Sequence, residues 1–380
     1  MTQFELTDEQ RQIQEMAQKF TADEITPHAA EWDEKHHFPR DVVQKTGELG
    51  FGAIYVSEES GGINLGRLEA ALIMEAMAYG CPATSAYISI HNMASWMIDR
   101  FGGDTVKAKF LPKLVTMEHI ASYALTEPGS GSDAAGLKTS AKRDGDHYVL
   151  NGTKQFISGS GFNDIYVVMV RTGDHKNKGI SCLVIEKDTP GLSFGKPEKK
   201  LGWNASPTAQ LIFEDCRVPV ENRVGQEGEG FNFAMAGLDG GRLNIGACSL
   251  GGAQRCLDEA VAYTKERQQF DQPIADFQNT QFMLADMATE LEAARALLYL
   301  AAAKVTANAP DKTRFSAMAK RLATDSGSNI VNNALQLFGG YGYLKEYPIE
   351  RFWRDLRVHS ILEGTNQVMR MIVSRDMLRQ

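Results

Sequence analysis

The period of the hydrophobic pattern changes twice along the 380-residue chain, and this change constrains the fold more than any single motif. Apolar residues recur at helical spacing over residues 1–117, form short strand-like runs over 118–225, and return to helical spacing over 226–380. A chain of this length has room for two or three compact units. The sequence therefore predicts an α+β fold with an N-terminal α-helical domain, a middle antiparallel β domain and a C-terminal α-helical domain, a four-helix bundle, divided at these limits.

Helical signals are strong in the first range. Thr7 and Gln10 have the spacing of a capping box, and an amphipathic pattern follows them. A second pattern covers Arg67–Tyr79 and is expected to end before Gly80, and the apolar run 86–97 is typical of a buried helix. His91 lies in this run, where a histidine is more often a hydrogen-bonded core residue than a ligand.

The middle range carries short strand patterns and no helix-length amphipathic run. Ser122–Leu125 is the first strand-like segment. The dipeptides at 144–145 (Asp-Gly) and 151–152 (Asn-Gly) are typical of hairpin turns. Further strands are expected at Ile165–Val170, Ile180–Ile185 and Leu211–Phe213, with turns at Pro190-Gly191 and Ser206-Pro207.

Long amphipathic helices resume after the glycine-rich segment 225–230. Their apolar periodicity predicts helices near 232–268, 279–305, 312–338 and 364–378. The short connections favour antiparallel packing of these helices. Three modules in this order leave clefts between them, where ligands usually bind.

Charge and cysteine content exclude several classes of protein. The formal net charge of −8 argues against general binding to nucleic acids or membrane surfaces. The five cysteines are scattered without a C-x-x-C pair, and no motif predicts a metal site. The N-terminal stretch resembles no presequence. We therefore expect a soluble cytoplasmic protein with reduced, buried thiols, or a mitochondrial matrix protein if this is a mature eukaryotic chain.

A glutamate near the C-terminus is the strongest candidate for chemistry. Glu363 precedes a helical pattern that Thr365 or Asn366 can cap, so it is expected beside unsatisfied N–H groups at a helix N-terminus. A carboxylate there can accept a proton while neighbouring amides bind the oxyanion that deprotonation creates. A glutamate at a helix start is, however, more often only a favourable partner of the helix dipole.

Three other motifs are ambiguous when each is taken alone. The loop 125–133 formally matches a dinucleotide fingerprint, but no helix follows it, so it is either a ligand-contacting loop or a surface turn. The segment 156–158 (Phe-Ile-Ser) fits a half-buried strand or a ring-stacking site equally well. The two glycines of segment 238–242 weaken a helix by about 1 kcal/mol each, which favours close approach of a ligand or another backbone. Arg242 can bind a phosphate or brace Asp239.

Together these motifs resemble the acyl-CoA dehydrogenase family over essentially the whole chain. The most specific matches are Leu125–Asp133 (LTEPGSGSD) and Ile361–Thr365 (ILEGT). Within the family, the chain is most similar to the branch that acts on isobutyryl-CoA. That similarity rests on FISG at 156–159, KKLGWN at 199–204, GGRLNI at 240–245 and GGYGYLK at 339–345.

The resemblance implies FAD bound between the β domain and the C-terminal bundle. Residues implied near the flavin are Tyr123, Leu125, Thr126, Gly131, Ser132, Phe156, Ile157 and Ser158, with Ser158 near the reactive N5 side. The adenine and pyrophosphate end is implied to contact Arg267, Phe270, Phe277, Gln278, Gln336, Leu337, Gly339 and Gly340, partly across a subunit boundary. Thr365 and Gln367 complete the implied site. Many relatives have Trp-Ile-Thr at 156–158, so the smaller aromatic implies weaker stacking on the flavin.

The resemblance also implies an acyl-CoA site. Its residues are Ser132, Asp239, Gly240, Gly241, Arg242, Gly364 and Arg375. Some branches of the family keep their catalytic glutamate on the bundle helix, just before the arginine that matches Arg242. That position is Gly241 here, which cannot act as a base, so Glu363 is the family-consistent catalyst.

The implied reaction is the FAD-dependent α,β-dehydrogenation of isobutyryl-CoA to methacrylyl-CoA, a step of valine catabolism. Glu363 is expected to remove the α-proton while the β-hydrogen passes to FAD as hydride, and burial under bound substrate is expected to raise its pKa toward the working pH. The substrates 2-methylbutyryl-CoA and butyryl-CoA remain open, and an acyl-CoA oxidase or a non-catalytic scaffold that binds CoA or flavin are rival functions. The family further implies electron-transferring flavoprotein as electron acceptor and a homotetramer.

Overall fold

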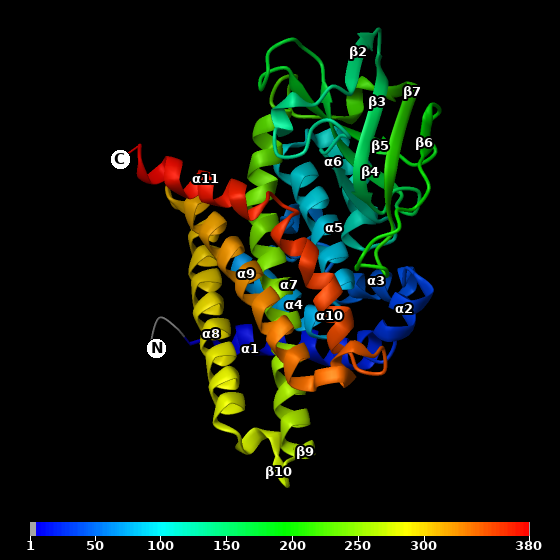
Figure 1. The fold of residues 1–380 in the computed structure, drawn as a ribbon. Helices are drawn as coiled ribbons and strands as arrows, with labels where there is room; N and C mark the ends of the chain where they lie inside the picture. The colour runs from blue at the N-terminus through cyan, green and yellow to red at the C-terminus, as the bar shows by residue number, and fades with distance from the viewer. Residues whose placement is uncertain (1–4, 380) are drawn as a thin grey trace.

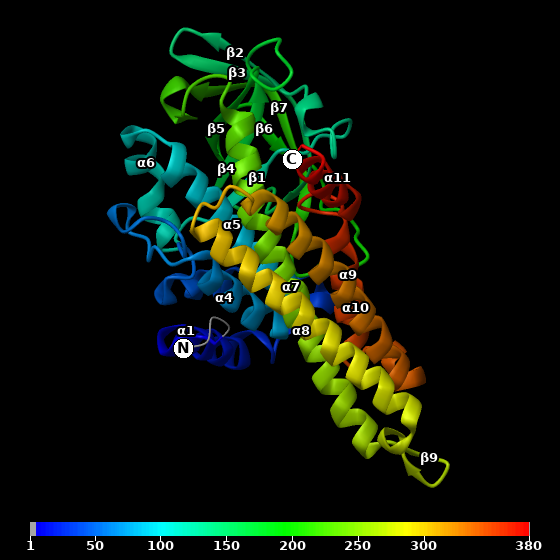
Figure 2. The same ribbon diagram turned by 90° about the vertical axis from the view of Figure 1, so that its left-hand side faces the viewer.

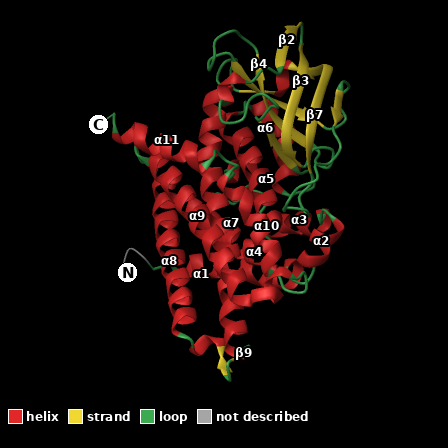
Figure 3. Ribbon diagram, in the orientation of Figure 1, coloured by secondary structure: helices red, strands yellow, loops and turns green. Residues whose placement is uncertain are grey.

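The helical and β parts of the chain separate clearly in space. The computed structural model describes residues 5–379, so the N-terminal residues 1–4, on which the expectation of no presequence rested, lie outside it. Long helices make up most of the molecule, and a β-sheet lies at one end of it (Figures 1 and 3). The predicted α+β fold, with helical, β and helical parts in that order, is confirmed.

Six α-helices precede the sheet. They are α1 (Asp8–Phe20), α2 (Ala29–Lys35), α3 (Arg40–Lys45), α4 (Arg67–Gly80), α5 (Pro82–Phe101) and α6 (Asp104–Val115). The capping box is confirmed, because the Gln10 backbone N–H donates to Thr7 Oγ1 at 3.2 Å and the Thr7 backbone N–H donates to Gln10 Oε1 at 3.0 Å. The predicted end before Gly80 is one residue early, since Gly80 closes α4 and α5 starts with Pro82 in its first turn.

Eight strands form the sheet. They are β1 (Ala121–Ala124), β2 (Ser140–Asp144), β3 (His147–Ser158), β4 (Ile165–Arg171), β5 (Ile180–Glu186), β6 (Leu192–Phe194), β7 (Thr208–Pro219) and β8 (Arg223–Val224). Seven of them follow the order β6-β7-β3-β2-β4-β5-β8, and β1 also pairs with β4. Neighbours are antiparallel except that β1 and β2 each run parallel to β4, so the sheet is mixed rather than wholly antiparallel.

The two predicted hairpin turns have different outcomes. Asp144 pairs with His147 across a tight turn, which confirms the first. The second is wrong, because Gly152 lies inside β3, where the pairing with β7 shifts register after Leu150. A Cβ at Gly152 would lie 2.7 Å from Thr139 Cα, and its φ is +144°. The glycine therefore permits a β-bulge rather than a chain reversal.

Five α-helices follow the sheet. They are α7 (Gly230–Glu266), α8 (Gln278–Thr306), α9 (Lys312–Phe338), α10 (Ile349–Arg357) and α11 (Asn366–Met377). The four predicted helices match α7, α8, α9 and α11 within two residues at each end, and α10 was not predicted. Helices α7, α8 and α9 lie side by side in both views, and a small hairpin of β9 (Gln268–Gln269) and β10 (Gln272–Pro273) closes the end of α7 remote from the sheet (Figures 1 and 2).

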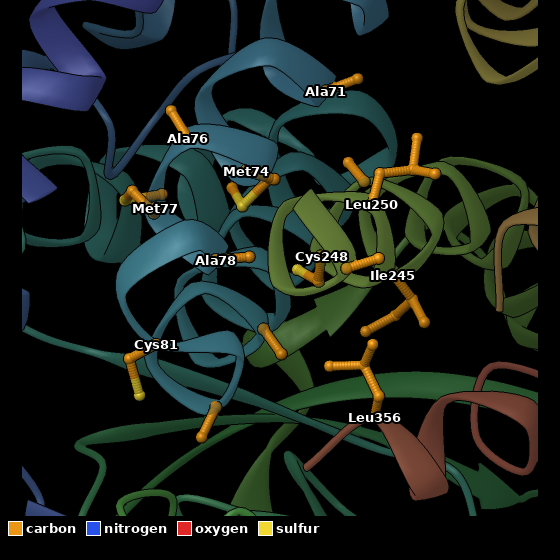
Figure 4. Packing of buried hydrophobic residues seen from close by; sticks show 14 of the residues in the cluster. Ala71, Met74, Ala76, Met77, Ala78, Cys81, Ile245, Cys248, Leu250 and Leu356 are labelled. Atoms are coloured by element: carbon orange, nitrogen blue, oxygen red, sulfur yellow. The ribbon is translucent and has the colours of Figure 1, made fainter. Parts of the chain in front are cut away.

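Helix α4 packs closely against α7 in the main hydrophobic core. Figure 4 shows Met74 and Ala78 of α4 facing Cys248 of α7. The approach depends on Gly251, because a Cβ there would lie 2.1 Å from the Glu75 carbonyl oxygen. The first helical part is thereby joined to the third, around the middle of α7.

Strand β4 anchors the sheet to the helices. Its residues alternate between two cores, as the pleat of a strand requires. Ile165, Val167 and Met169 pack into the cluster that includes residues of α5, α6 and α7. The side chains of Tyr166, Val168 and Val170 pack into a second cluster on the other face, with residues of β3 and β7. This double burial fixes the sheet beside the start of α7.

Two expectations about buried polar groups are confirmed. All five cysteines are buried with free thiols. His91 is fully buried, with Nε2 3.0 Å from the Leu114 carbonyl oxygen and Nδ1 accepting from the Ala121 N–H at 3.0 Å. Over residues 5–379, no helix is both long enough and apolar enough to span a bilayer.

Candidate active site

Glu363 lies in a tight turn that leads into α11. Thr365 caps this helix, since its Oγ1 accepts from the Val368 N–H at 3.2 Å, and this confirms one of the two expected caps. Glu363 has a φ of +54° and Gly364 a φ of +88°. A left-handed conformation is strained for a glutamate and is typical of functional sites. The turn directs Glu363 back toward α7 rather than along α11.

The Glu363 carboxylate is enclosed beside Gly241 of α7. Its Oε2 atom is buried and accepts no hydrogen bond from residues 5–379. Burial raises the pKa of Glu363 to about 7, against the charges of Arg242 and Lys320, which lower it. A Cβ on residue 241 would lie 2.7 Å from Oε2, so glycine is the residue that leaves room for this carboxylate.

The glycine pair of α7 therefore accommodates side chains rather than another backbone, and close approach of a ligand stays a prediction. A Cβ on Gly240 would lie 2.3 Å from the Arg67 guanidinium, as the Cβ on Gly241 would meet Glu363. Arg67 is buried and lies 3.6 Å above the centre of the Tyr55 ring. Two groups that are distant in sequence thus converge on consecutive residues of one helix.

Arg242 and Asp239 brace each other. Arg242 Nη1 donates to Asp239 Oδ1 at 2.7 Å, and Thr313 Oγ1 donates to Asp239 Oδ2 at 2.6 Å. Arg242 Nε also donates to the Glu363 carbonyl oxygen at 3.4 Å. Of the two roles left open for Arg242, the structure shows the bracing one, and it adds a contact to the backbone of the candidate base.

Lys320 of α9 also belongs to this site and was not predicted from the sequence. This lysine is fully buried, and its Nζ donates to the Gly364 carbonyl oxygen at 2.8 Å and to Asn366 Oδ1 at 2.9 Å. Burial lowers its pKa to about 8, partly offset by the Glu363 charge. A sequence signal for this residue was present, because Lys320 lies among alanines on the buried face of α9.

Two further enclosed polar atoms lie near the carboxylate. The Tyr123 hydroxyl of β1 and Asn244 Oδ1 of α7 have no hydrogen-bond partner within residues 5–379. Burial and the Glu363 charge raise the pKa of Tyr123. Because buried polar groups are normally paired, several unpaired ones together indicate a place built for a ligand.

His359 ties the site to a loop of the β part. It is fully buried four residues before Glu363, with Nδ1 2.7 Å from Ser249 Oγ, and its Nε2 accepts from Trp203 Nε1 at 3.3 Å. Burial lowers the pKa of His359 to about 3, so the ring is neutral at ordinary pH. Sequence reasoning did not single out this residue.

The two β-part motifs lie beside each other. The Gln155 N–H donates to the Thr126 carbonyl oxygen at 2.8 Å, which joins the loop 125–133 to the end of β3. Leu125, Thr126 and Ser158 are partly buried, whereas Gly131 and Ser132 are exposed. Phe156 is 65% exposed with a φ of +59°, and the Ile157 side chain packs inward. An exposed aromatic ring and open glycines thus share one surface.

The remaining predicted cofactor residues lie at the other end of α7. Arg267, Gln336, Leu337, Gly339 and Gly340 line one groove of about 450 Å³. Phe270, Phe277 and Gln278 adjoin it in the hairpin and at the start of α8, with the two phenylalanine rings 6.1 Å apart. Helix α7 rises by roughly 39 Å between Gly241 and Arg267, so this groove is remote from Glu363.

The predicted residues of α11 are only partly enclosed. Thr365 is half-buried at the cap, whereas Gln367 and Arg375 are exposed. The structure therefore brings together Tyr123, Gly240, Gly241, Arg242 and Glu363, and leaves the groove residues as a separate group.

Comparisons with known proteins agree along the whole chain. Three family models match it: "Acyl-CoA dehydrogenase, N-terminal domain" at residues 7–118, "middle domain" at 122–216 and "C-terminal domain" at 228–378. The mitochondrial isobutyryl-CoA dehydrogenase of Dictyostelium discoideum is 58% identical over 373 residues, which is 98% of this chain and 90% of that protein.

Solved structures show the same fold. The butyryl-CoA dehydrogenase of Megasphaera elsdenii is 38% identical with a TM-score of 0.97, over 100% of both chains. A chain in a structure described as the electron transferring flavoprotein of Acidaminococcus fermentans is 43% identical with a TM-score of 0.97, again over 100% of both chains. The chain is therefore an oxidoreductase that belongs to the acyl-CoA dehydrogenase family.

Proposed function

We propose that the protein catalyses the FAD-dependent α,β-dehydrogenation of isobutyryl-CoA to methacrylyl-CoA, with Glu363 as the base. The observation that carries this proposal is the Glu363 carboxylate, whose enclosed Oε2 has no partner within residues 5–379 and whose pKa is raised to about 7. A base whose pKa lies near the working pH is ionised in a large fraction of molecules and still binds a proton strongly enough to remove it from a substrate. A structural glutamate in the same place would be paired.

The backbone of the same turn supplies the second catalytic element. No carbonyl or side-chain oxygen of residues 5–379 accepts a hydrogen bond from the Glu363 N–H. We assign this N–H to the thioester carbonyl of the substrate, where it stabilises negative charge as the α-proton leaves. Glu363 Oε2 accepts that proton, and the Arg242 contact to the Glu363 carbonyl oxygen holds the peptide in place.

The residues implied for FAD are suited to it. The distal groove offers a guanidinium from Arg267, an amide from Gln336, and two glycines with open space where a Cβ would stand. These are groups that bind a pyrophosphate closely. FAD, when bound, supplies the acceptor for the β-hydrogen and its electron pair. Tyr123, Thr126, Ser132, Phe156 and Ser158 are proposed to hold its flavin end.

The wide separation of the two groups of predicted FAD residues supports an oligomer. Gly241 beside Glu363 and the distal groove are roughly 39 Å apart along α7, which is more than one dinucleotide can bridge within one chain. We propose that two copies share each FAD, one giving the flavin end and the other the groove, within a homotetramer. Light scattering of the FAD-loaded protein at its working concentration tests this. A monomer that binds FAD at full stoichiometry would contradict it.

Isobutyryl-CoA is proposed from the 58% identical relative. A pocket discriminates one methylene by only about 1–3 kcal/mol, so the test is a steady-state panel of isobutyryl-, 2-methylbutyryl- and butyryl-CoA with an artificial acceptor. The highest kcat/KM is expected for isobutyryl-CoA. Electron-transferring flavoprotein is proposed as the physiological acceptor and the cytoplasm as the location. Rapid reoxidation by oxygen with peroxide formation would favour an acyl-CoA oxidase instead.

The decisive experiment on Glu363 compares Glu363→Gln with Glu259→Gln, which changes a surface glutamate of α7 paired with Arg255. We expect Glu363→Gln to bind FAD and acyl-CoA but to bleach the flavin about 10²–10⁴-fold more slowly in stopped flow. The Glu259→Gln protein is expected to bleach at the normal rate. Normal bleaching by Glu363→Gln would refute the assignment, and a scaffold would bleach in neither variant nor in the unaltered protein.

A further inference from the structure

Lys320 has an unusual set of partners for a buried lysine. Its side chain is fully buried, and its Nζ donates only to neutral oxygens, the Gly364 carbonyl and Asn366 Oδ1. No carboxylate of residues 5–379 lies within ion-pair distance of Nζ. Burying an ammonium without a counter-ion is costly, so such a group is seldom kept for packing alone.

Both acceptors belong to the turn that carries Glu363. Gly364 follows Glu363 directly, and the two residues have positive φ angles. Asn366 Nδ2 also donates to Thr324 Oγ1 at 2.9 Å and to Asp325 Oδ1 at 2.6 Å. Helix α9 therefore forms several hydrogen bonds with the start of α11. Of these, the bond from Lys320 to the Gly364 carbonyl oxygen lies nearest to Glu363 in sequence.

We propose that Lys320 is a positioning residue, whose ammonium group fixes the left-handed turn at Glu363–Gly364 and keeps the Glu363 carboxylate against Gly241. This inference rests on the proposed role of Glu363 as base. The turn is strained at Glu363, so an outside contact must hold it, and the bond from Nζ to the Gly364 carbonyl oxygen at 2.8 Å is such a contact. Arg242 of α7 donates a hydrogen bond to the preceding carbonyl oxygen, that of Glu363.

Besides its hydrogen bond to the turn, the positive charge of Lys320 also acts on Glu363, whose pKa it lowers. The cations that lower the pKa of Glu363 are Arg242 of α7 and Lys320 of α9, while Arg67 lies beside the neighbouring Gly240. The neutral titratable groups around Glu363 are Tyr123 of β1 and Tyr55. Lys320 itself faces Glu363, Arg242 and Asp325. Of these two cations Arg242 pairs with Asp239, whereas Lys320 has no carboxylate within ion-pair distance among residues 5–379, and it favours the ionised form of Glu363.

The test titrates Glu363 directly by infrared spectroscopy of the FAD-loaded protein, with Glu363→Gln to identify its carboxyl band. We expect Lys320→Met to move the midpoint upward by about one pH unit or more. At high pH, where Glu363 is ionised in both proteins, kcat for flavin bleaching is expected to fall about 10–100-fold. KM for acyl-CoA is expected to stay within a few-fold, since the Glu363 carboxylate and N–H act mainly on the charge that develops as the α-proton leaves.

Two further variants keep the test decisive. Lys304→Met removes a lysine of α8 that pairs with Asp311, and it is expected to leave the Glu363 midpoint unchanged. If Lys320→Met does not fold, Lys320→Gln, which loses the charge but keeps a donor, is read in the same way for the midpoint. An unmoved midpoint in the folded variant, or an unchanged kcat at high pH in Lys320→Met, overturns the proposal.

The readouts separate this inference from the proposed function. The infrared midpoint reports proton affinity at Glu363 whether or not Glu363 is the base. If Glu363→Gln bleaches normally, the base assignment fails, whereas a shifted midpoint in Lys320→Met would still show that Lys320 acts on Glu363.

Discussion

Two buried lysines, Lys154 and Lys320, lie beside glutamates, but the groups that accept their hydrogen bonds differ. In the β part, Lys154 Nζ donates to Glu127 Oε1 at 2.8 Å and to the Leu125 carbonyl oxygen at 3.0 Å. The N–H groups of Lys138 and Thr139 donate to the same carboxylate at 2.6 and 2.9 Å. Burial alone would raise the pKa of Glu127, but these partners outweigh it and lower the pKa.

Near the start of α11 the same residue types are arranged without mutual pairing. Lys320 donates to neutral oxygens, and Glu363 Oε2 has no hydrogen-bond partner among the described residues 5–379. Burial therefore prevails and raises the pKa of Glu363 to about 7. A buried pair with satisfied hydrogen bonds thus supports a loop, whereas the unpaired Glu363 at a strained turn costs stability, as expected of the base that we propose.

The largest effect is expected from breaking the satisfied pair. Glu127→Gln leaves the Lys154 charge buried without a counter-ion, which is expected to destabilise the protein by about 3–5 kcal/mol. Calorimetry of the FAD-loaded protein measures this as a lower melting temperature. The double variant Glu127→Gln with Lys154→Met removes the stranded charge and is expected to recover part of the loss. If the double variant is no more stable than the single one, the pair does not act as described.

The opposite sign is expected at the unsatisfied site. The pKa of Glu363 is raised above its unfolded value, so its contribution to stability is full below about pH 4.5 and is lost as pH rises through about 7. Glu363→Gln removes that loss and is expected to stabilise the protein at pH 8 by on the order of 2 kcal/mol. The melting temperature of the variant is expected to exceed that of the unaltered protein at pH 8 by more than at pH 5.5. A decrease at pH 8 would show that the carboxylate is paired after all.

Features of the fold that depend on residues close in sequence could be predicted, and features that depend on distant residues could not. The α+β order and the limits of α7, α8, α9 and α11 follow from periodicity, which is a local property. The turn at Asn151–Gly152 was misread because the same dipeptide serves a hairpin or a bulge, and only the neighbouring strand decides. The proposed limits at 117/118 and 225/226 remain a prediction.

The candidate site was only half visible for a related reason. Glu363 and its cap follow from residues adjacent in sequence, and both were found. Lys320 and His359 were missed because their roles depend on contacts across helices, at separations of 44 and 110 residues. The reason for glycine at 241 also depends on such a contact, since the group it accommodates comes from the far end of the chain.

A smaller change tests that accommodation. Gly241→Ala places a Cβ 2.7 Å from Glu363 Oε2, so the carboxylate must move. We expect flavin bleaching to slow by about 10–100-fold, because a shift of about 1 Å at a reacting group has effects of that size. Gly246→Ala is the matched control in the same helix, since its Cβ meets Leu298 Cδ1 at 2.8 Å in the core. It is expected to lower the melting temperature without a selective loss of rate.

The smallest effect is a pH dependence that distinguishes the two carboxylates without any substitution. Glu127, with its lowered pKa, is ionised throughout the range in which the enzyme works, whereas Glu363 titrates near 7. The base must be ionised, so kcat/KM is expected to rise with pH, to lose about tenfold per unit below 7, and to level off above it. Steady-state rates between pH 5.5 and 9 measure this limb, which reports the free enzyme. A flat profile across pH 7 would mean that the group governing the reaction resembles the paired glutamate more than the unpaired one.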